Sequence, residues 1–340
     1  MLKWSSEEFS TLPWRVNRSL FGTLVSEIML QQTTVATVLN HYPKFIKKYN
    51  TPKKLAAISE EEILLEWKGL GYYRRARNLL NASKQIVEEH AGKLPLEYEV
   101  LLSIKGIGEY TANAILSIGA HKRALCIDAN LERILARFYG IEEEKGAKLM
   151  RDLKNKFETG LILREIDDDQ MGALAEAFMD TGRIYCQANK VDCKNCPLSK
   201  NCIAYKKGNA LDLPISLKKS KKVFFDLELL RIIVKKKGTF MAYQKNNKQW
   251  LAKQYELPTF LLSTQDKALK QYPLIEAGDS FQLLPTFKTS ITKYKITNRV
   301  LQLSEGMFKR FLKKHDLVND FTYLKEVNKL STASSKALDL

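Results

Sequence analysis

Apolar residues recur at three- and four-residue steps through the first 205 residues, the spacing of one face of an α-helix. The pattern is clearest from Leu20 to Val38, where leucine, valine, isoleucine and methionine return at helical intervals. A helix-start signal follows at Thr51, a capping residue that directly precedes Pro52. We therefore predict that residues 1–205 form helices joined by short turns.

The pattern changes after residue 205. Residues 206–222 are rich in lysine and weakly apolar, which predicts a basic linker. Four later stretches have the aromatic, β-branched and alternating residues of strands, namely 223–236, 238–245, 281–287 and 289–303. Residues 306–326 return to helical spacing, and the tail 328–340 is predicted to be disordered. We expect a mostly α region at 1–205 and a smaller α/β domain at 223–327.

Composition adds a class of partner. Lysine and arginine number 55 against 38 aspartate and glutamate, a net charge of +17. Such a surplus favours a polyanionic partner through counterion release, although a lysine-rich proteome gives the same charge and charge alone does not separate nucleic acid from a membrane. No apolar run approaches the roughly 18 residues of a membrane span, and the N-terminus lacks the apolar core of a secretory signal. We expect no membrane partner and a cytoplasmic location, nucleoid-associated if the protein is bacterial.

Four of the five cysteines fall within seventeen residues, separated by six, two and five others: Cys186, Cys193, Cys196 and Cys202. In a reducing compartment this clustering favours metal ligation over disulfides. Four thiolates suit either a tetrahedral zinc or a cubane iron–sulfur cluster. The spacing favours iron–sulfur only modestly. The fifth cysteine, Cys126, lies in an apolar run and is interpreted as a core residue.

A glycine pair and a later aspartate mark a second region. Gly106 and Gly108 flank Ile107 between two helical patterns. A helix–hairpin–helix there would leave backbone N–H groups free to hold a phosphate, although an ordinary tight turn gives the same pattern. Twenty residues after Gly108, Asp128 precedes a long amphipathic helix. Its default role is the helix N-cap, but its carboxylate could instead face a cleft.

Together these features resemble the helix-hairpin-helix base-excision glycosylases that carry a [4Fe-4S] cluster. Four motifs, from about residue 10 to 205, resemble the A/G-specific adenine glycosylases, the MutY family: LPWR at 12–15, SEIMLQQTTVATV at 26–38, WKGLGYYRRARNL at 67–79 and IDANLERILAR at 127–137. The resemblance implies a helix-hairpin-helix glycosylase fold and a [4Fe-4S] cluster on the four cysteines of 186–202. It also implies a monomer that acts on double-stranded DNA containing A:8-oxoguanine or A:G mispairs.

One position separates two branches of this superfamily. The endonuclease III branch has a lysine nucleophile two residues past the second hairpin glycine, and here that residue is Tyr110. Without an amine, no Schiff base with the sugar C1′ can form, so a monofunctional glycosylase is favoured over a glycosylase/lyase for oxidised pyrimidines. A non-catalytic DNA-binding or iron–sulfur redox protein is the third alternative, but it would need neither an acid at Glu27 nor a carboxylate at Asp128.

The resemblance also implies catalytic roles. Glu27 would protonate the extruded adenine, because adenine leaves poorly until a ring nitrogen carries a proton. Asp128 would stabilise the positive charge on the sugar or bond to it transiently. Tyr110 and Asn130 match positions that support this pair through hydrogen bonds.

Other positions match contacts to the base or to DNA. Arg15 and Glu176 match residues near the adenine edge, although either could be a surface ion-pair partner. Gln32 and Tyr72 match residues that wedge beside the orphaned base, with Thr33 as a neighbouring DNA contact. Tyr72 or the next tyrosine could instead pack beneath its glycine turn. Gly106 and Gly108 match the hairpin that grips the DNA backbone.

The C-terminal half resembles the Nudix-like domain that this family uses to read 8-oxoguanine, through FFDLELLRIIV and QWLAKQYELPTF. It has no GX5EX7REUXEE box, so nucleotide hydrolysis is not expected. Where the family often has Phe-Ser-His against the lesion, this chain has Ile291-Thr292-Lys293. Thr292 is the candidate hydrogen-bond donor to the lesion at this position. A generic protein-interaction module is the alternative for this half.

Overall fold

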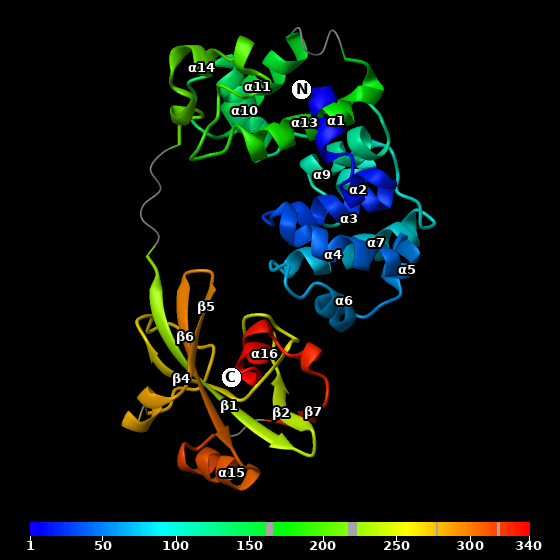
Figure 1. Cartoon of the computed structure of the whole chain (residues 1–340). Helices are drawn as coiled ribbons and strands as arrows, with labels where there is room; N and C mark the ends of the chain where they lie inside the picture. Colours follow the sequence, from blue (N-terminus) through cyan, green and yellow to red (C-terminus); the bar gives the residue numbers. More distant parts are fainter. Residues whose placement is uncertain (161–165, 217–222, 277, 318–319) are drawn as a thin grey trace. The chain divides into compact units, whose positions relative to one another are not determined.

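The computed structural model describes residues 1–160, 166–216, 223–276, 278–317 and 320–340 (Figure 1). The chain divides into two compact units. One comprises Met1–Ile63 and Leu70–Lys219, and the other comprises Leu64–Gly69 and Ser220–Leu340. None of the described helices is both long and apolar enough to cross a membrane.

The first unit is built from short helices, as predicted. They are α1 (Leu2–Phe9), α2 (Pro13–Val16), α3 (Leu20–Leu30), α4 (Val35–Lys48), α5 (Pro52–Ala56), α6 (Glu60–Glu66, which ends in the second unit), α7 (Arg74–Glu89), α8 (Tyr98–Ser103), α9 (Glu109–Ala114), α10 (Ala129–Tyr139), α11 (Ala147–Thr159), α13 (Met171–Ile184) and α14 (Ile203–Lys207). A π-helical turn at Ile115–Gly119 continues α9, and 3-10 turns lie at Asp168–Gln170, Ser199–Asn201 and Ala210–Asp212.

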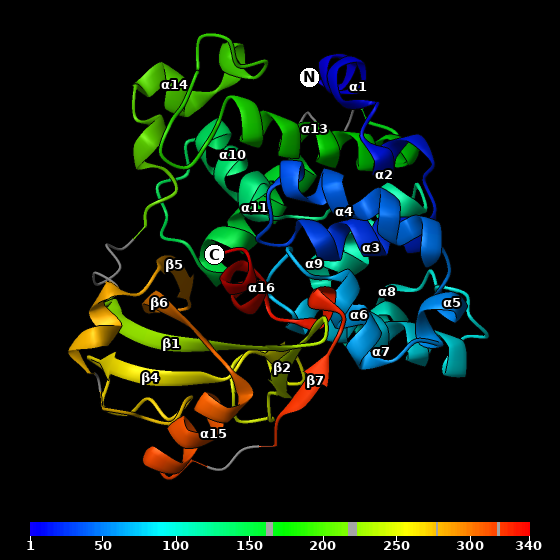
Figure 2. The same cartoon turned by 60° about the horizontal axis from the view of Figure 1, so that its bottom comes forward.

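Helix α3 is the buried centre of this unit and packs against α4, α7 and α9 (Figure 2). The side chain of Ser19 caps its N-terminus by accepting a hydrogen bond from the Gly22 N–H. Every residue from Phe21 to Met29 is buried, so the helix is enclosed on all sides. A charged side chain within this stretch is therefore removed from water.

The helix–hairpin–helix prediction agrees with helices α8 and α9, which flank the glycine pair. Gly106 has a φ of +96°, and a Cβ there would lie 2.8 Å from the Cβ of Asn78. Only glycine satisfies both constraints. Gly108 is different: it is the extended N-cap residue of α9, and a Cβ there would meet nothing within 4 Å.

A second core lies between α10, α11 and α13, centred on Leu135, Phe157 and Phe178. Helix α10 begins at the Asp128 cap and ends at Gly140, whose φ of +61° gives a left-handed C-cap. These two ends fix the helix that presents the predicted carboxylate.

The second unit contains, within its described residues, a seven-stranded mixed sheet in the order β3-β2-β1-β6-β5, with β4 paired to β1 and β7 to β2. The strands are β1 (Phe225–Lys236), β2 (Thr239–Gln244), β3 (Tyr255–Glu256), β4 (Thr259–Thr264), β5 (Thr286–Ile291), β6 (Tyr294–Leu303) and β7 (Thr322–Leu324). β1 and β6 are parallel, in a register that runs from Phe225 opposite Tyr294 to Val234 opposite Leu303. The other pairs are antiparallel. Helices α15 (Glu305–Lys314) and α16 (Thr332–Leu338) pack against β1.

Three strand and helix predictions in this unit need correction. The run 289–303 contains a hairpin, because β5 ends at Ile291 and β6 begins at Tyr294. In the run 281–287, a 3-10 turn at Asp279–Leu283 precedes the strand. The helix predicted over 306–326 ends at Lys314 and is followed by β7.

The prediction of a disordered tail was wrong, because residues 332–338 form α16. Its small side chains allow close packing on the sheet, where Ser334 and Ala337 are completely buried. The Ser334 hydroxyl also accepts a hydrogen bond from the Leu257 N–H. Composition suggested disorder because it does not reveal that the sheet offers a surface for small residues.

The predicted linker is also shorter than expected. Lys206 and Lys207 form the last turn of α14, and the buried Leu213 accepts a hydrogen bond from Arg137 through its carbonyl. Part of the predicted linker is therefore packed into the helical unit. Residues 217–222 lie outside the described residues.

Candidate active site

Glu27 lies in α3 and is 6% exposed. Its Oε2 accepts a hydrogen bond from the Tyr110 hydroxyl at 2.5 Å. Burial raises the pKa of the Glu27 carboxyl from 4.5 to about 7, and the nearby charges of Glu176 and Asp128 raise it further, against the lowering effect of the Tyr110 hydrogen bond. The carboxyl therefore carries a proton over much of the range below neutrality and can act as an acid.

Asp128 performs the helix-cap role that its position suggested. Its Oδ1 accepts hydrogen bonds from the backbone N–H groups of Asn130 at 2.9 Å and Leu131 at 2.7 Å. Its Oδ2 accepts from the Asn130 side-chain amide at 2.7 Å. Burial raises the pKa of Asp128, and these hydrogen bonds oppose the rise. The charge of Asp128 also raises the pKa of Glu27. The same carboxylate therefore caps α10 and lies within electrostatic reach of Glu27.

Asn130 links this carboxylate to the cysteine loop. Its Oδ1 accepts a hydrogen bond at 2.8 Å from Arg133, whose Nε donates at 2.7 Å to the Cys186 carbonyl. The backbone approaches closely here, since a Cβ at Gly182 would lie 2.9 Å from the Asn130 Cβ. A continuous series of hydrogen bonds thus connects Asp128 with the start of the cysteine loop.

Arg15 and Glu176 are brought together, with two partners that sequence reasoning missed. Arg15 donates through Nε to Glu176 at 3.1 Å and through Nη1 to Asp180 at 2.9 Å. Arg18 donates through Nη2 to both carboxylate oxygens of Glu176 at 3.0 Å. The available signal for Asp180 was its position four residues after Glu176, one helical turn along α13.

The two predicted wedge residues lie in loops with unusual backbone angles. Gln32 and Tyr72 have φ values of 55° and 47°, a region that residues with a Cβ rarely adopt. Tyr72 is 60% exposed, whereas Tyr73 is only partly exposed at the start of α7. Thr33 is held by a hydrogen bond from Arg75. The exposure of Tyr72 fits a role outside the core, and its wedge role stays a prediction.

The four clustered cysteines are free thiols, each partly buried. Burial and the neighbouring thiols raise the pKa of Cys196 to about 11, so the sulfurs lie within electrostatic reach of one another. Within the described ranges, no three cysteine, histidine or acidic side chains already form a closed metal shell. An all-sulfur donor set in one loop nevertheless fits an iron–sulfur cluster.

Arg137 holds the cysteine loop through hydrogen bonds. It is 2% exposed and donates to the Cys186 Sγ at 3.2 Å, the Gln187 carbonyl at 2.8 Å and the Leu213 carbonyl at 2.8 Å. These contacts hold the Cys186 sulfur and the backbone that follows it in place at the start of the loop.

In the sheet unit, Thr292 occupies the turn between β5 and β6 and is exposed, with a φ of 50°. Its neighbour Lys293 is ion-paired with Asp266 at 2.9 Å, and Asp266 also accepts from the Tyr294 hydroxyl at 2.6 Å. Lys293 also lies over the Phe225 ring, 4.5 Å from its centroid. Lys293 and Tyr294 thus anchor the turn to Asp266, while Thr292 itself is exposed.

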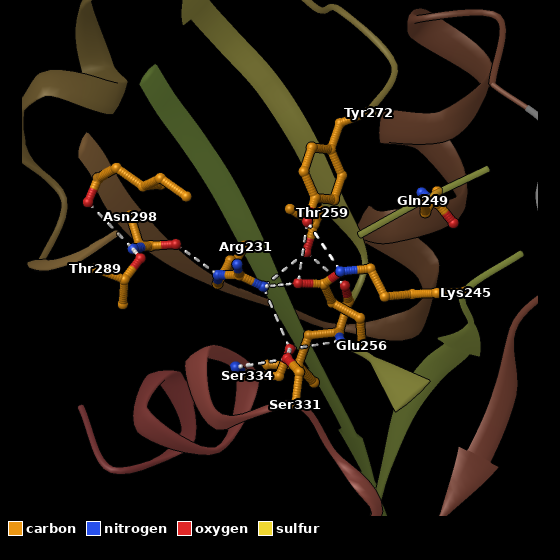
Figure 3. A network of polar contacts seen from close by, with 12 residues as sticks. Arg231, Lys245, Gln249, Glu256, Thr259, Tyr272, Thr289, Asn298, Ser331 and Ser334 are labelled. Atoms are coloured by element: carbon orange, nitrogen blue, oxygen red, sulfur yellow. Dashed lines mark hydrogen bonds and ion pairs between the residues drawn. The ribbon is translucent and has the colours of Figure 1, made fainter. Parts of the chain in front are cut away.

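A buried polar network crosses the same unit (Figure 3). Glu256 accepts from Arg231 at 2.7 Å and from Lys245 at 2.6 Å. Arg231 continues the network to Asn298 on β6, at 2.8 Å, and to Ser334 on α16, at 3.3 Å. Nothing in the sequence pattern had indicated this network. It connects the strands with the C-terminal helix.

Known proteins share the sequence pattern and the fold of the helical unit. Residues 25–159 match the model of the HhH-GPD superfamily base excision DNA repair protein. The helical fold is similar to a solved thermostable thymine-DNA glycosylase, with a TM-score of 0.52 and 26% identity over 61% of this chain and 93% of that one. An endonuclease III–DNA complex matches with a TM-score of 0.50 and 24% identity, over 61% of this chain and 94% of that one, which supports the fold alone.

The curated relatives are more specific. The adenine DNA glycosylase of Buchnera aphidicola subsp. Baizongia pistaciae is 32% identical over 85% of this chain and 76% of its own length. That of Buchnera aphidicola subsp. Schizaphis graminum is 36% identical over 72% of this chain and 66% of its own length. The Homo sapiens adenine DNA glycosylase is 36% identical over 60% of this chain, which spans only 38% of the human protein. The chain belongs to the adenine DNA glycosylase family, enzymes that hydrolyse N-glycosyl bonds.

Proposed function

We propose that this protein is a monofunctional glycosylase that removes adenine opposite 8-oxoguanine or guanine from duplex DNA, in base excision repair. The pairing of Glu27 with Tyr110 carries the proposal. A lyase needs an amine nucleophile, whereas burial raises the pKa of the Tyr110 phenol well above 10 and keeps it neutral. The neutral hydroxyl serves instead as a hydrogen-bond donor to the acid.

The first step is proton transfer to the base. With its pKa at about 7, Glu27 delivers a proton to a ring nitrogen of the extruded adenine. Protonation makes adenine a competent leaving group. The electron pair of the C1′–N bond then departs with a neutral base, whereas without the proton it would depart with an anion. Arg15 and Arg18 hold Glu176 in a fixed position, from which its carboxylate can orient the base edge.

The second step is stabilisation of the sugar. Loss of adenine leaves an oxocarbenium ion, and the Asp128 carboxylate stabilises that charge from its fixed position at the α10 cap. Water then adds to C1′, and its proton passes to the Glu27 carboxylate that the first step left ionised. The products are free adenine and an intact strand with an abasic sugar.

The remaining candidates serve DNA binding. When bound by Cys186, Cys193, Cys196 and Cys202, a [4Fe-4S] cluster would supply rigidity to their loop. Lysines interleaved among the cysteines would then contact phosphate. The hairpin at Gly106 and Gly108 would grip the DNA backbone, and the hydroxyl of the exposed residue Thr292 would contact 8-oxoguanine.

A single-turnover assay tests the proposal on three duplexes, with A opposite 8-oxoguanine, A opposite guanine, and thymine glycol. Products are examined with and without alkali. We expect strand breaks at adenine only, and only after alkali treatment. Direct nicking at thymine glycol would instead support the glycosylase/lyase, and no cleavage by cluster-loaded protein would support a non-catalytic role.

A further inference from the structure

Arg75 lies on α7, is 8% exposed, and reaches two loops with one guanidinium group. Its hydrogen bonds fall into two sets. Nη1 donates to the carbonyls of Ile28, Met29 and Gln31 at 2.8, 2.8 and 2.5 Å. Nη2 donates to the Thr33 hydroxyl at 2.8 Å and to the carbonyls of Leu70 and Gly71 at 3.0 and 3.2 Å.

The first set of contacts closes the C-terminal end of α3. The last carbonyls of a helix lack partners within the helix, and a cation there also complements the helix dipole. Arg75 donates hydrogen bonds to the carbonyls of Ile28 and Met29 and places a positive charge beside them. Because Glu27 lies on the same final turn, Arg75 fixes how the chain leaves the helix that carries the acid.

The second set of contacts joins that exit to the turn before α7. Both segments contain a non-glycine residue with positive φ, Gln32 at 55° and Tyr72 at 47°. Such conformations cost free energy and persist only where the surroundings fix them. Arg75 bonds the residues on either side of Gln32 and the residue just before Tyr72, and its guanidinium lies 5.5 Å from the centre of the Tyr72 ring.

We propose that Arg75 is a positioning residue that locks Gln32 and Tyr72 in the conformations that enter the duplex beside the extruded adenine. It acts on base extrusion, and it leaves bond cleavage to Glu27 and Asp128. The inference rests on the proposed function for its wedge step. The clamp itself is a property of the two loops and can be measured without DNA.

The guanidinium is essential to this role because of its shape. Its planar fork presents donors in fixed directions, so one group reaches acceptors in both loops. Lysine keeps the charge and has a similar stem, but its single ammonium cannot span the same acceptors. Arg75→Lys is therefore the informative substitution. Arg77→Lys is the matched control, since Arg77 lies on the same helix and pairs with Glu60 at 2.8 Å.

Three measurements test the clamp. Amide hydrogen exchange compares segments 30–34 and 69–73 in wild type, Arg75→Lys and Arg77→Lys. We expect about tenfold faster exchange in both segments for Arg75→Lys alone. Stopped-flow fluorescence of 2-aminopurine in place of the target adenine measures extrusion, which should be about tenfold slower in Arg75→Lys. The pH profile of the single-turnover rate of adenine release is also compared. Its alkaline limb, where the rate falls as pH rises, should lie at the same pH in Arg75→Lys as in wild type, because Glu27 keeps its surroundings.

Wild-type exchange in either segment of Arg75→Lys, or wild-type extrusion, would overturn the proposal. So would a displaced alkaline limb accompanied by a lower melting temperature, since that combination describes general loosening. If Arg75→Lys does not fold, Thr33→Val removes one acceptor of the clamp and should slow extrusion about threefold; an unchanged rate would count against the clamp. If wild type releases no adenine, the proposed function fails, while the exchange experiment still decides the clamp.

Discussion

Two buried glutamates behave in opposite ways in this chain. Glu27 is 6% exposed and Glu256 is 1% exposed, yet the pKa of Glu27 is raised to about 7 and that of Glu256 is lowered to about 2. Burial disfavours both carboxylates. At Glu256, however, Lys245 and Arg231 lie within 2.7 Å and outweigh it, whereas Glu27 accepts from a neutral hydroxyl. The nature of the partner, more than the depth of burial, decides whether the pKa of a buried carboxyl is raised or lowered.

The two sites contribute to stability in opposite pH ranges. Glu27 binds its proton more tightly when folded, so stability falls as pH rises from about 4.5 to about 7. Glu256 binds its proton less tightly when folded, so its contribution is present above about 4.5 and is lost as pH falls toward 2. Each shift corresponds to about 3 kcal/mol.

The largest effect expected from this comparison is on activity. Glu27→Gln removes the transferable proton and should reduce single-turnover adenine release about 10³-fold, while duplex binding is retained. The amide still accepts from Tyr110, so the melting temperature at pH 7 should not fall. Glu7→Gln is the matched control, on a side chain that is 66% exposed. Substantial adenine release by Glu27→Gln would remove Glu27 from its role.

The same substitution at the other glutamate should affect stability instead. Glu256→Gln leaves Arg231 and Lys245 buried with an uncompensated charge, which should cost about 3–5 kcal/mol of unfolding free energy. Denaturant unfolding at pH 7 measures this loss. A cost below about 1 kcal/mol would mean that the network has little stabilising value.

The pH dependence of adenine release should follow Glu27. Because the proposed mechanism uses the protonated form of Glu27, the single-turnover rate should fall about tenfold per pH unit above pH 7. Rate measurements from pH 5 to 9 on A opposite 8-oxoguanine give the profile. A rate that stays flat up to pH 9 would contradict a protonated Glu27 as the acid.

The smallest effect should come from Tyr110→Phe. The Tyr110 hydrogen bond lowers the pKa of Glu27, so its removal should raise that pKa and move the alkaline limb upward. The proposed proton transfer needs no phenol, so adenine release should persist below pH 7. A downward displacement of the limb would show that Tyr110 acts on Glu27 in some other way.

The sequence was sufficient for features that depend on local rules. Helical spacing predicted the first unit, and the glycine pair predicted a hairpin. In the structure, Gly106 of this pair takes a positive φ. Asp128 could be predicted as a cap because capping involves only the next three residues. Motif resemblance indicated the family, and the similarity to its relatives over most of the chain shows that the chain belongs to it.

The tertiary structure alone decided features that join residues distant in sequence. The sequence placed Glu27 in an apolar helix, but only the packing around α3 and the Tyr110 contact set its pKa. The contacts of Arg75 and the Glu256 network could not be predicted from the sequence either, because their partners come from separate segments. The tail was misjudged because burial of Ser334 depends on a sheet formed far upstream. Caps and turns depend on residues that are adjacent in sequence, so the sequence predicts them. The pKa of a buried group depends on charges and hydrogen-bond partners that only the folded chain brings close to it.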